Sequence, residues 1–365
     1  MSNPKEIQRK KFEEYLVGLQ PEIDRVIEKY FPKKASKNWL EFVFQKPRYT
    51  YSLEAAQKAL LDPVWDFISR GGKRWRPILF LLITEAVGGD IRKVKDFVII
   101  PELIHNGTII VDDLEDQGEL RRGKPCLHLI FGVDIAINAG NFLYFFPLLA
   151  LIKNKDKFKS EVVNSAYEVY NQEMINIALG QGTDIFWHKG KAKNITEEEY
   201  LQMCAYKTGC LSRMAAKLAV VLSGGSKELI EAAGRVAEAM GVGFQIQDDI
   251  LDIALSGEER EKFGKAFGND IKEGKRTLMV IHTLKKATPE DKKRLIEILD
   301  KHTDNMEERR EAIEIIQKYD SVEYAKEVAK KIMSEAWQEA DKLLKPSPAK
   351  NRLKEFVYYL IERQV

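Results

Sequence analysis

Apolar residues recur at three- and four-residue spacing along most of this chain, which is the period of an amphipathic α-helix. Alternating runs of β-branched residues, the mark of half-buried strands, are few. Two start signals agree with helices, because Thr196 and Glu199 form a capping-box sequence and Thr288 precedes a proline. The pattern predicts long helices at Ile7–Tyr30, Tyr51–Ser69, Val94–Gln117, Val162–Ile185, Glu197–Leu222, Lys227–Leu255 and Tyr324–Leu344.

Proline positions and composition favour one continuous helical domain. None of the 12 prolines lies between Pro147 and Pro289, and a proline inside a helix costs about 3 kcal/mol. No linker rich in Gly, Ser or Pro divides the chain, and 44% of its 365 residues are hydrophobic, so a sizeable core can be buried. We therefore expect a single all-α domain of about a dozen helices.

Charge and cysteine content exclude several function classes. The 58 Lys+Arg against 56 Asp+Glu give a net charge of +2, whereas a binder of nucleic acid working by bulk electrostatics needs a clear basic excess. Three cysteines without a CxxC pair exclude a disulfide scaffold and a cysteine zinc site, and they favour the cytoplasm. The polar N-terminus predicts no signal peptide. Two asparagines and Pro147 dilute the uncharged stretch Ile135–Ile152, so we expect a buried helix there and no transmembrane segment.

A cluster of carboxylates follows an apolar helical pattern in the segment Ile109–Pro125, which reads IIVDDLEDQGELRRGKP. Asp113 is part of it, and a spacing of four places Asp112 and Asp116 on one helix face, one turn apart. Like charges so placed repel each other, so a cation is needed to offset them. Mg²⁺ fits, because it binds carboxylate oxygens together with substrate phosphates. For this segment alone, a solvated acidic helix end is the alternative.

A second segment, Gly241–Asp252, reads GVGFQIQDDILD and repeats the arrangement with Asp248, Asp249 and Asp252. Two clusters of the same spacing, each ending an apolar helical stretch, are stronger evidence for metal than either alone. The simplest geometry places the two helices face to face across a cavity, with several Mg²⁺ ions between them.

Basic residues accompany both acidic clusters. The segment GGKRWRP precedes a helix predicted to start at Pro77, and helix N-termini with nearby Lys and Arg bind phosphates well. It is not a Walker A loop, because Arg74 follows Lys73 where that motif has Ser or Thr, and the first glycine of the motif is missing. Taken singly, a basic residue is more often a solvated surface charge. The candidates are Lys73, Arg76, Arg121, Arg122, Lys207, Lys265 and Lys275.

These segments together resemble the trans-type isoprenyl diphosphate synthase family. The resemblance covers about Leu53 to Leu284, and the motifs occur in the family's order: GGKRWRP, DDLED, RRGKP, KTG and QIQDDILD. Several further segments (LRRGKP, INAGN, QGTDIFW, TEEEY) are similar to geranylgeranyl diphosphate synthases of the eukaryotic type. The resemblance implies a single-domain, all-α isoprenoid synthase fold around a central cavity, usually in a homodimer. We expect this domain at residues 46–365, after an N-terminal helical extension at residues 1–45.

The resemblance also implies a prenyltransferase that uses up to three Mg²⁺ ions for the head-to-tail 1'-4 condensation of isopentenyl diphosphate with an allylic diphosphate. The implied metal ligands are Asp112, Asp113, Asp116, Asp248, Asp249 and Asp252. The implied catalytic residues are Asp112, Asp116, Asp248, Lys207 and Lys265. The allylic diphosphate would lie against Lys207, Thr208, Gln245, Lys265, Arg121 and Lys275. Isopentenyl diphosphate would lie against Lys73, Arg76, His105 and Arg122.

Product length is expected to depend on Gly107 and Thr108. Gly107 precedes Asp112 by five residues, about 7.5 Å along the helix. A bulky aromatic residue there stops the growing chain in the family, so the resemblance implies that glycine leaves this point open and would accept a ring. We expect a C20 product, geranylgeranyl diphosphate; longer products (C25 or more) and farnesyl diphosphate are the alternatives.

Two other classes are less consistent with the sequence. A terpene cyclase normally replaces the second acidic cluster with an Asn/Ser/Glu metal triad, whereas DDILD is present here. A non-catalytic regulatory subunit usually loses its acidic clusters, and this chain has both.

Overall fold

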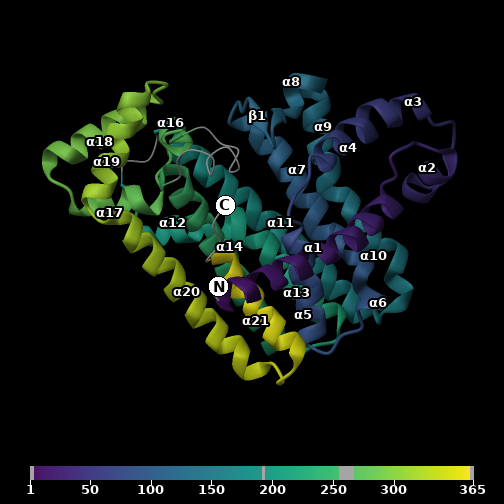
Figure 1. Ribbon diagram of the computed structural model, residues 1–365. Helices are drawn as coiled ribbons and strands as arrows, with labels where there is room; N and C mark the ends of the chain where they lie inside the picture. The colour runs from purple at the N-terminus through teal and green to yellow at the C-terminus, as the bar shows by residue number, and fades with distance from the viewer. Residues whose placement is uncertain (1–3, 191–193, 255–266, 362–365) are drawn as a thin grey trace. The chain divides into compact units, whose positions relative to one another are not determined.

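The computed structural model describes residues 4–190, 194–254 and 267–361 (Figure 1). Within these ranges the chain is helical almost throughout, and the strands found there form one two-stranded antiparallel sheet. The predicted all-α class is therefore confirmed. The chain forms two compact units, residues 1–165 with 221–224 and residues 166–220 with 225–365.

The first unit packs its helices around buried aromatic and aliphatic side chains, among them Ile27, Phe31, Phe67 and Phe80. Phe31 follows the first helix and makes edge contacts with Trp39, so the N-terminal segment is part of this core. Its elements are α1 (Pro4–Tyr30), α2 (Lys37–Phe44), α3 (Leu53–Ala56), the π-turn η1 (Gln57–Leu61), α4 (Asp62–Ser69), α5 (Trp75–Ala86), α6 (Ile91–Val94), the 3₁₀ turn η2 (Lys95–Val98), α7 (Ile99–Glu115), β1 (Leu120–Arg121), β2 (Lys124–Pro125), α8 (Leu127–Phe131), α9 (Val133–Phe145), the 3₁₀ turn η3 (Phe146–Leu148), α10 (Leu149–Asn154) and the 3₁₀ turn η4 (Lys155–Lys157). The predicted domain boundary at residue 45 stays a prediction.

In the second unit, the long helix α14 packs against α20 through small and apolar side chains. The unit contains most of α11 (Ser160–His188), α12 (Glu197–Cys204), the π-turn η5 (Ala205–Gly209), most of α13 (Cys210–Leu222), α14 (Lys227–Ala254), α16 (Asn269–Lys272), α17 (Leu278–Lys286), α18 (Pro289–Lys301), α19 (Met306–Lys318), α20 (Ser321–Leu343) and α21 (Pro348–Ile361). Both predicted start signals are confirmed, since Thr196 forms a capping box with Glu199 and Thr288 is the N-cap of α18.

Two local features differ from the sequence prediction. Helix α5 begins at Trp75 rather than at Pro77, because Arg74 adopts a left-handed conformation (φ 50°) and serves as the N-cap. The small sheet was not predicted at all. Its turn residues, Arg122 and Gly123, have φ values of 52° and 73°, the pair of positive values that a two-residue type I′ hairpin requires.

The apolar stretch Val133–Lys157 is long and apolar enough to cross a membrane by length and composition, with a mean hydropathy of 1.8 over its most apolar window. Half of that window is buried inside the protein. The stretch consists of α9, η3 with Pro147, α10 and η4 rather than one regular helix. Burial and interruption are typical of a core segment, so the stretch is weak evidence for a span.

Candidate active site

The first acidic cluster stands at the C-terminal end of α7. Asp112 and Asp113 lie in the last turn, and Asp116 is the C-cap. This end of a helix carries the negative pole of the backbone dipole, so carboxylates here lower the stability of the helix unless a cation offsets them. Asp113 is buried, and Asp112 and Asp116 are half-buried.

Arg121 neutralises part of this cluster. Its Nε donates to Asp113 Oδ1 at 2.7 Å, and its Nη2 lies 3.8 Å from Asp112 Oδ2. Burial lowers the pKa of Arg121, but Asp113 and Asp112 raise it by more, so the net change is upward. Arg121 lies on β1, in the hairpin that follows α7 (Figure 1). Arg121, predicted to bind a diphosphate, is therefore held here by carboxylates.

One carboxylate oxygen of this cluster lacks a strong hydrogen-bond donor within the described ranges and could bind a cation. Oδ2 of Asp113 is buried and accepts no hydrogen bond from the described residues, the weakly donating thiol of Cys126 aside. Such an oxygen is costly to bury unless a donor or a cation satisfies it. Burial also raises the pKa of the Asp113 carboxyl, and Arg121 opposes that rise.

The side chains predicted to bind isopentenyl diphosphate come from three segments: Lys73 and Arg76 from the loop before α5 and its first turn, His105 from α7, and Arg122 from the turn of the hairpin. Burial, followed in effect by the charges of Arg76 and Arg122, lowers the pKa of His105 well below its usual value, so the imidazole is neutral at pH 7. Arg76 is buried and its guanidinium lies 4.3 Å from the centroid of the Trp75 ring. Lys73 is exposed in the loop before α5. Several positive charges converge here with one neutral histidine, which suits an anion.

Two polar residues of this region, Glu102 and Asn106, escaped the sequence analysis, and Arg74 was considered only as part of the segment GGKRWRP. Arg74, Glu102 and Asn106 are all buried, and Arg74 donates to Glu102 at 2.8 Å. The available signal was the polar pair Glu102 and Asn106, four residues apart inside the otherwise apolar start of the α7 pattern.

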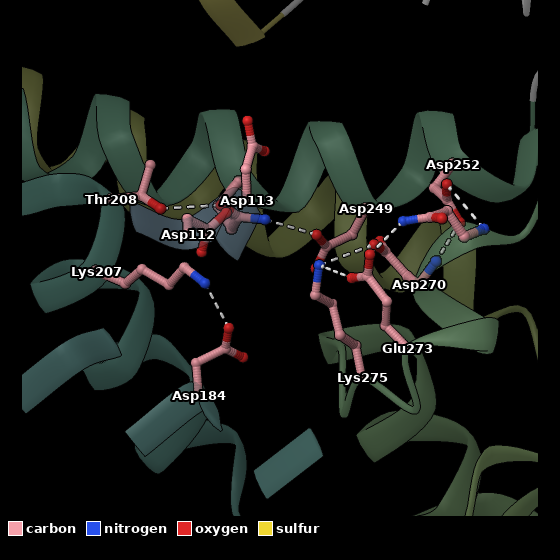
Figure 2. A network of polar contacts seen from close by, with 12 residues as sticks. Asp112, Asp113, Asp184, Lys207, Thr208, Asp249, Asp252, Asp270, Glu273 and Lys275 are labelled. Atoms are coloured by element: carbon pink, nitrogen blue, oxygen red, sulfur yellow. Dashed lines mark hydrogen bonds and ion pairs between the residues drawn. The ribbon is translucent and has the colours of Figure 1, made fainter. Parts of the chain in front are cut away.

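The second acidic cluster occupies the last turns of α14, and its aspartates differ in their surroundings. Asp248 is half-buried. Asp249 is buried and accepts hydrogen bonds from Tyr200 Oη and from Gln245 Nε2, both at 2.8 Å. Burial, with the Asp270 charge as the second cause, raises the pKa of Asp249 to about 8 (Figure 2).

Asp252 is fully buried and caps a short helix. Its two carboxylate oxygens accept the backbone N–H groups of Asn269 at 3.3 Å and Asp270 at 3.1 Å, at the start of α16. Since protein donors occupy Asp249 and Asp252, Asp248 is the member of the cluster with the most accessible position. Asp270 was missed by the sequence analysis, and its Oδ2 is buried without a hydrogen-bond partner in the described ranges.

Lys207 and Thr208 lie in the π-turn η5, between α12 and α13. The predicted helix Glu197–Leu222 is confirmed in its bounds, and η5 is a one-turn π-bulge inside it. Lys207 Nζ lies 2.5 Å from Asp184 Oδ2, and Thr208 Oγ1 donates to Gln245 at 2.9 Å (Figure 2). Asp184, on α11, was not predicted, although QGTDIFW contributed to the family resemblance.

Glycines on two neighbouring helices make room for this turn. A Cβ on Gly180 of α11 would lie 2.3 Å from the backbone nitrogen of Lys207. A Cβ on Gly241 of α14 would lie 2.5 Å from the Cα of Gly209. Backbone atoms cannot move aside as a flexible side chain can, so glycine at both positions determines where Lys207 sits.

Lys275 lies after α16 and forms ion pairs with Asp270 at 3.3 Å and Glu273 at 2.5 Å (Figure 2). It shares Asp270 as a neighbour with Asp249. The predicted Lys265 lies outside the described residues.

The expectation that Gly107 opens onto free space is wrong. A Cβ there would lie 2.8 Å from Leu143 Cβ and 2.9 Å from the Gly140 carbonyl oxygen, both on α9. Helices α7 and α9 therefore approach closely at this point, and glycine is required by packing. Thr108 is half-buried and its hydroxyl donates to the His105 carbonyl at 2.9 Å.

Within the described ranges, no three carboxylate, His or Cys side chains converge as a ready-made metal site. Each cluster alone is thus an incomplete coordination shell. That suits Mg²⁺, which keeps several waters and takes further oxygens from substrate phosphates. The unsatisfied oxygens of Asp113 and Asp270, and the position of both clusters at negative helix ends, favour a cation.

Known proteins share the sequence pattern and the fold of this chain. The family model described as polyprenyl synthetase matches residues 57–316. A short chain isoprenyl diphosphate synthase of Methanothermobacter thermautotrophicus is 38% identical over 307 residues, covering 84% of this chain and 91% of its own. A geranylgeranyl diphosphate synthase of Methanosarcina mazei is 34% identical, covering 81% and 87%.

Among solved structures, the geranylgeranyl pyrophosphate synthetase of Pyrococcus horikoshii superposes with a TM-score of 0.82 at 31% identity, covering 97% of this chain and 99% of its own. The predicted isoprenoid synthase fold is thereby confirmed, whereas the finer likeness to eukaryotic-type enzymes is not. The match to more than half of the chain, together with these relatives, shows that this protein is a prenyltransferase that belongs to the polyprenyl synthetase family.

Proposed function

We propose that this protein condenses isopentenyl diphosphate with an allylic diphosphate, head to tail, and that its main product is the C20 geranylgeranyl diphosphate. The observation that carries the proposal is the pairing, in each unit, of carboxylates at a helix C-terminus with a group of Lys or Arg side chains. The C20 length is supported by the names of relatives at 34% and 31% identity.

In this proposal Asp112, Asp116 and Asp248 hold up to three Mg²⁺ ions, with Asp113, Asp249 and Asp252 supporting them. When bound, Mg²⁺ neutralises the negative charge on the diphosphate leaving group. The three supporting aspartates are held by hydrogen bonds of their own: Asp113 from Arg121, Asp249 from Tyr200 and Gln245, and Asp252 from the backbone at the start of α16.

The allylic diphosphate lies, in this proposal, against Lys207, Thr208, Gln245, Arg121, Lys265 and Lys275. Breaking the allylic C–O bond leaves a cation on the carbon and builds charge on the diphosphate, so contacts from Lys207 strengthen as the reaction proceeds. Its present partner, Asp184, holds the ammonium in place.

Isopentenyl diphosphate lies against Lys73, Arg76, Arg122 and the neutral His105. Its double bond attacks the allylic carbon, and a proton then leaves the new chain; the departing diphosphate is the base that we propose for it. In this proposal the substrates react in an apolar cavity that excludes water, which would otherwise capture the cation.

We further propose a homodimer in the cytoplasm. Along α9, Val133, Ile137 and Phe145 are 52%, 42% and 70% exposed, and exposed apolar side chains of this kind are typical of a subunit interface. The three cysteines are free and buried, which suits a reducing compartment. Light scattering on the purified protein tests the dimer, and a monomeric mass would contradict it.

The test of the function is product analysis. Purified protein is incubated with Mg²⁺, isopentenyl diphosphate and one allylic primer, and the dephosphorylated alcohols are identified by mass spectrometry. A C20 alcohol is expected. A cyclic hydrocarbon would indicate a terpene cyclase, and no elongated product from folded protein would contradict synthase activity.

A further inference from the structure

Besides burial, two arginines of the first unit, Arg74 and Arg122, lower the pKa of His105, but they differ in their partners. Arg74 is paired with carboxylates, since its Nη1 donates to Glu102 Oε1 at 2.8 Å and its Nε to Asp24 Oδ1 at 3.1 Å. Arg122 forms no ion pair with a carboxylate of the described chain. Its guanidinium carbon lies 4.8 Å from the centroid of the Phe67 ring, and its Nη1 donates to the Phe67 carbonyl at 3.4 Å.

The side chain between them is Asn106, which is fully buried on α7 one turn after Glu102. Its Nδ2 donates to the Glu102 backbone carbonyl at 2.7 Å and to Glu102 Oε1 at 3.0 Å. Its Oδ1 accepts from Arg122 Nη1 at 3.3 Å. A primary amide has donors on one side and an acceptor on the other, so Asn106 joins the carboxylate to the guanidinium through neutral groups.

We propose that Asn106 is a positioning residue for isopentenyl diphosphate, because its amide fixes Arg122 while it keeps the Glu102 carboxylate from pairing with that guanidinium. The proposal rests on the proposed function. Glu102 then forms its ion pair with Arg74, which holds the loop before α5. The guanidinium of Arg122 is left to bind a phosphate. A buried guanidinium in contact with a carboxylate would attract a second anion far less.

The electrostatics of the two arginines agree with this division. Burial lowers the pKa of Arg122 to about 10, as expected for a cation with no carboxylate in contact. Burial also lowers the pKa of Arg74, but Glu102 and Asp24 raise it by more, so its net change is upward.

The primary test is Asn106→Asp, which puts a carboxylate of the same shape against Arg122. We expect the Kd and KM of isopentenyl diphosphate to rise about tenfold or more, the range for a lost charge-assisted contact. The KM of the allylic diphosphate and kcat at saturation should change much less. Binding is measured by calorimetry with isopentenyl diphosphate alone, and kinetics with both substrates.

Asn106→Ala and Asn154→Ala form a matched pair that separates positioning from stability. Asn154 is likewise buried in the first unit, and its Nδ2 donates to the Ala150 carbonyl and to Tyr30 Oη, both at 2.8 Å. Both alanine variants should lose a similar amount of thermal stability. Only Asn106→Ala should weaken isopentenyl diphosphate binding.

The outcomes are distinguishable. Unchanged isopentenyl diphosphate binding in both Asn106 variants of an active enzyme would overturn the positioning role. An equal loss of binding in Asn154→Ala would overturn it as well, because general destabilisation would then account for the effect. Folded wild-type protein that makes no prenyl product would instead contradict the proposed function.

Discussion

Asp249 is a buried carboxyl whose proton couples folding to pH. Its pKa is raised from 3.8 to about 8, chiefly by burial, so the folded chain holds the proton more tightly than the unfolded chain does. Stability from this group is complete below pH 4 and is lost as the pH rises towards 8. We therefore expect the metal-free protein to unfold at lower temperature at pH 8.5 than at pH 6, and Mg²⁺ to restore more stability at the higher pH.

Circular dichroism melts between pH 5 and pH 9, with and without Mg²⁺, measure this dependence. Asn at position 249 cannot ionise, so Asp249→Asn should flatten the metal-free profile and melt higher than wild type at pH 8.5. A variant whose melting temperature keeps the wild-type slope with pH would show that another group causes it.

Substitutions at Arg76 and Lys207 should distinguish the two substrate sites. Arg76→Ala removes a buried cation beside His105, so the KM of isopentenyl diphosphate should rise by about tenfold or more. Lys207→Ala should instead lower kcat and raise the KM of the allylic substrate, because its contact strengthens as the leaving group gains charge. Steady-state kinetics measure both, and an exchange of the two effects would reverse the assignment of the sites.

At the scale of elements, the crossing of α7 and α9 limits what position 107 accepts. A Cβ on Gly107 would collide with the backbone of Gly140 and the Cβ of Leu143, and overfilling a packed site costs about 1–3 kcal/mol. Gly107→Ala should therefore lower the melting temperature, and Gly107→Phe should lower it further without acting as a simple tunnel plug.

Gly18 of α1 is the matched control, since nothing lies within 4 Å of a Cβ placed there. Gly18→Ala should raise stability slightly, by about 0.5–1 kcal/mol, the usual gain in a helix. A Gly107→Phe variant as stable as wild type would contradict the close crossing.

The hydrophobic period was sufficient to predict α7 and α14, because each keeps one apolar face over several turns. It also placed both acidic clusters at the ends of these helices. The π-bulge at Lys207 does not follow from the period, because the room for it comes from Gly180 and Gly241 on other helices. The crowding at Gly107 depends in the same way on α9, which sequence spacing does not reveal.

At the scale of the whole molecule, the order of the motifs was enough to identify the chemistry. It did not predict which residue each charged side chain pairs with. Lys73, Arg74 and Arg76 are neighbours in sequence, yet the left-handed turn at Arg74 directs that side chain to Glu102. The pairing of Lys207 with Asp184 and the capping role of Asp252 likewise arise from contacts between distant segments. Family motifs therefore predict which residues matter, and packing decides what each one does.

The central claim is that the half-buried aspartates of the two acidic clusters, Asp112 and Asp248, serve turnover rather than folding. It is tested most directly by the rate at which labelled isopentenyl diphosphate enters product at saturating Mg²⁺ in Asp112→Ala and Asp248→Ala. Glu115→Ala is the matched control, since Glu115 is an exposed acid in the same turn of α7. We expect both aspartate variants to lose turnover by orders of magnitude with unchanged helical circular dichroism, and the control to stay active. Near wild-type turnover in either aspartate variant would contradict the account.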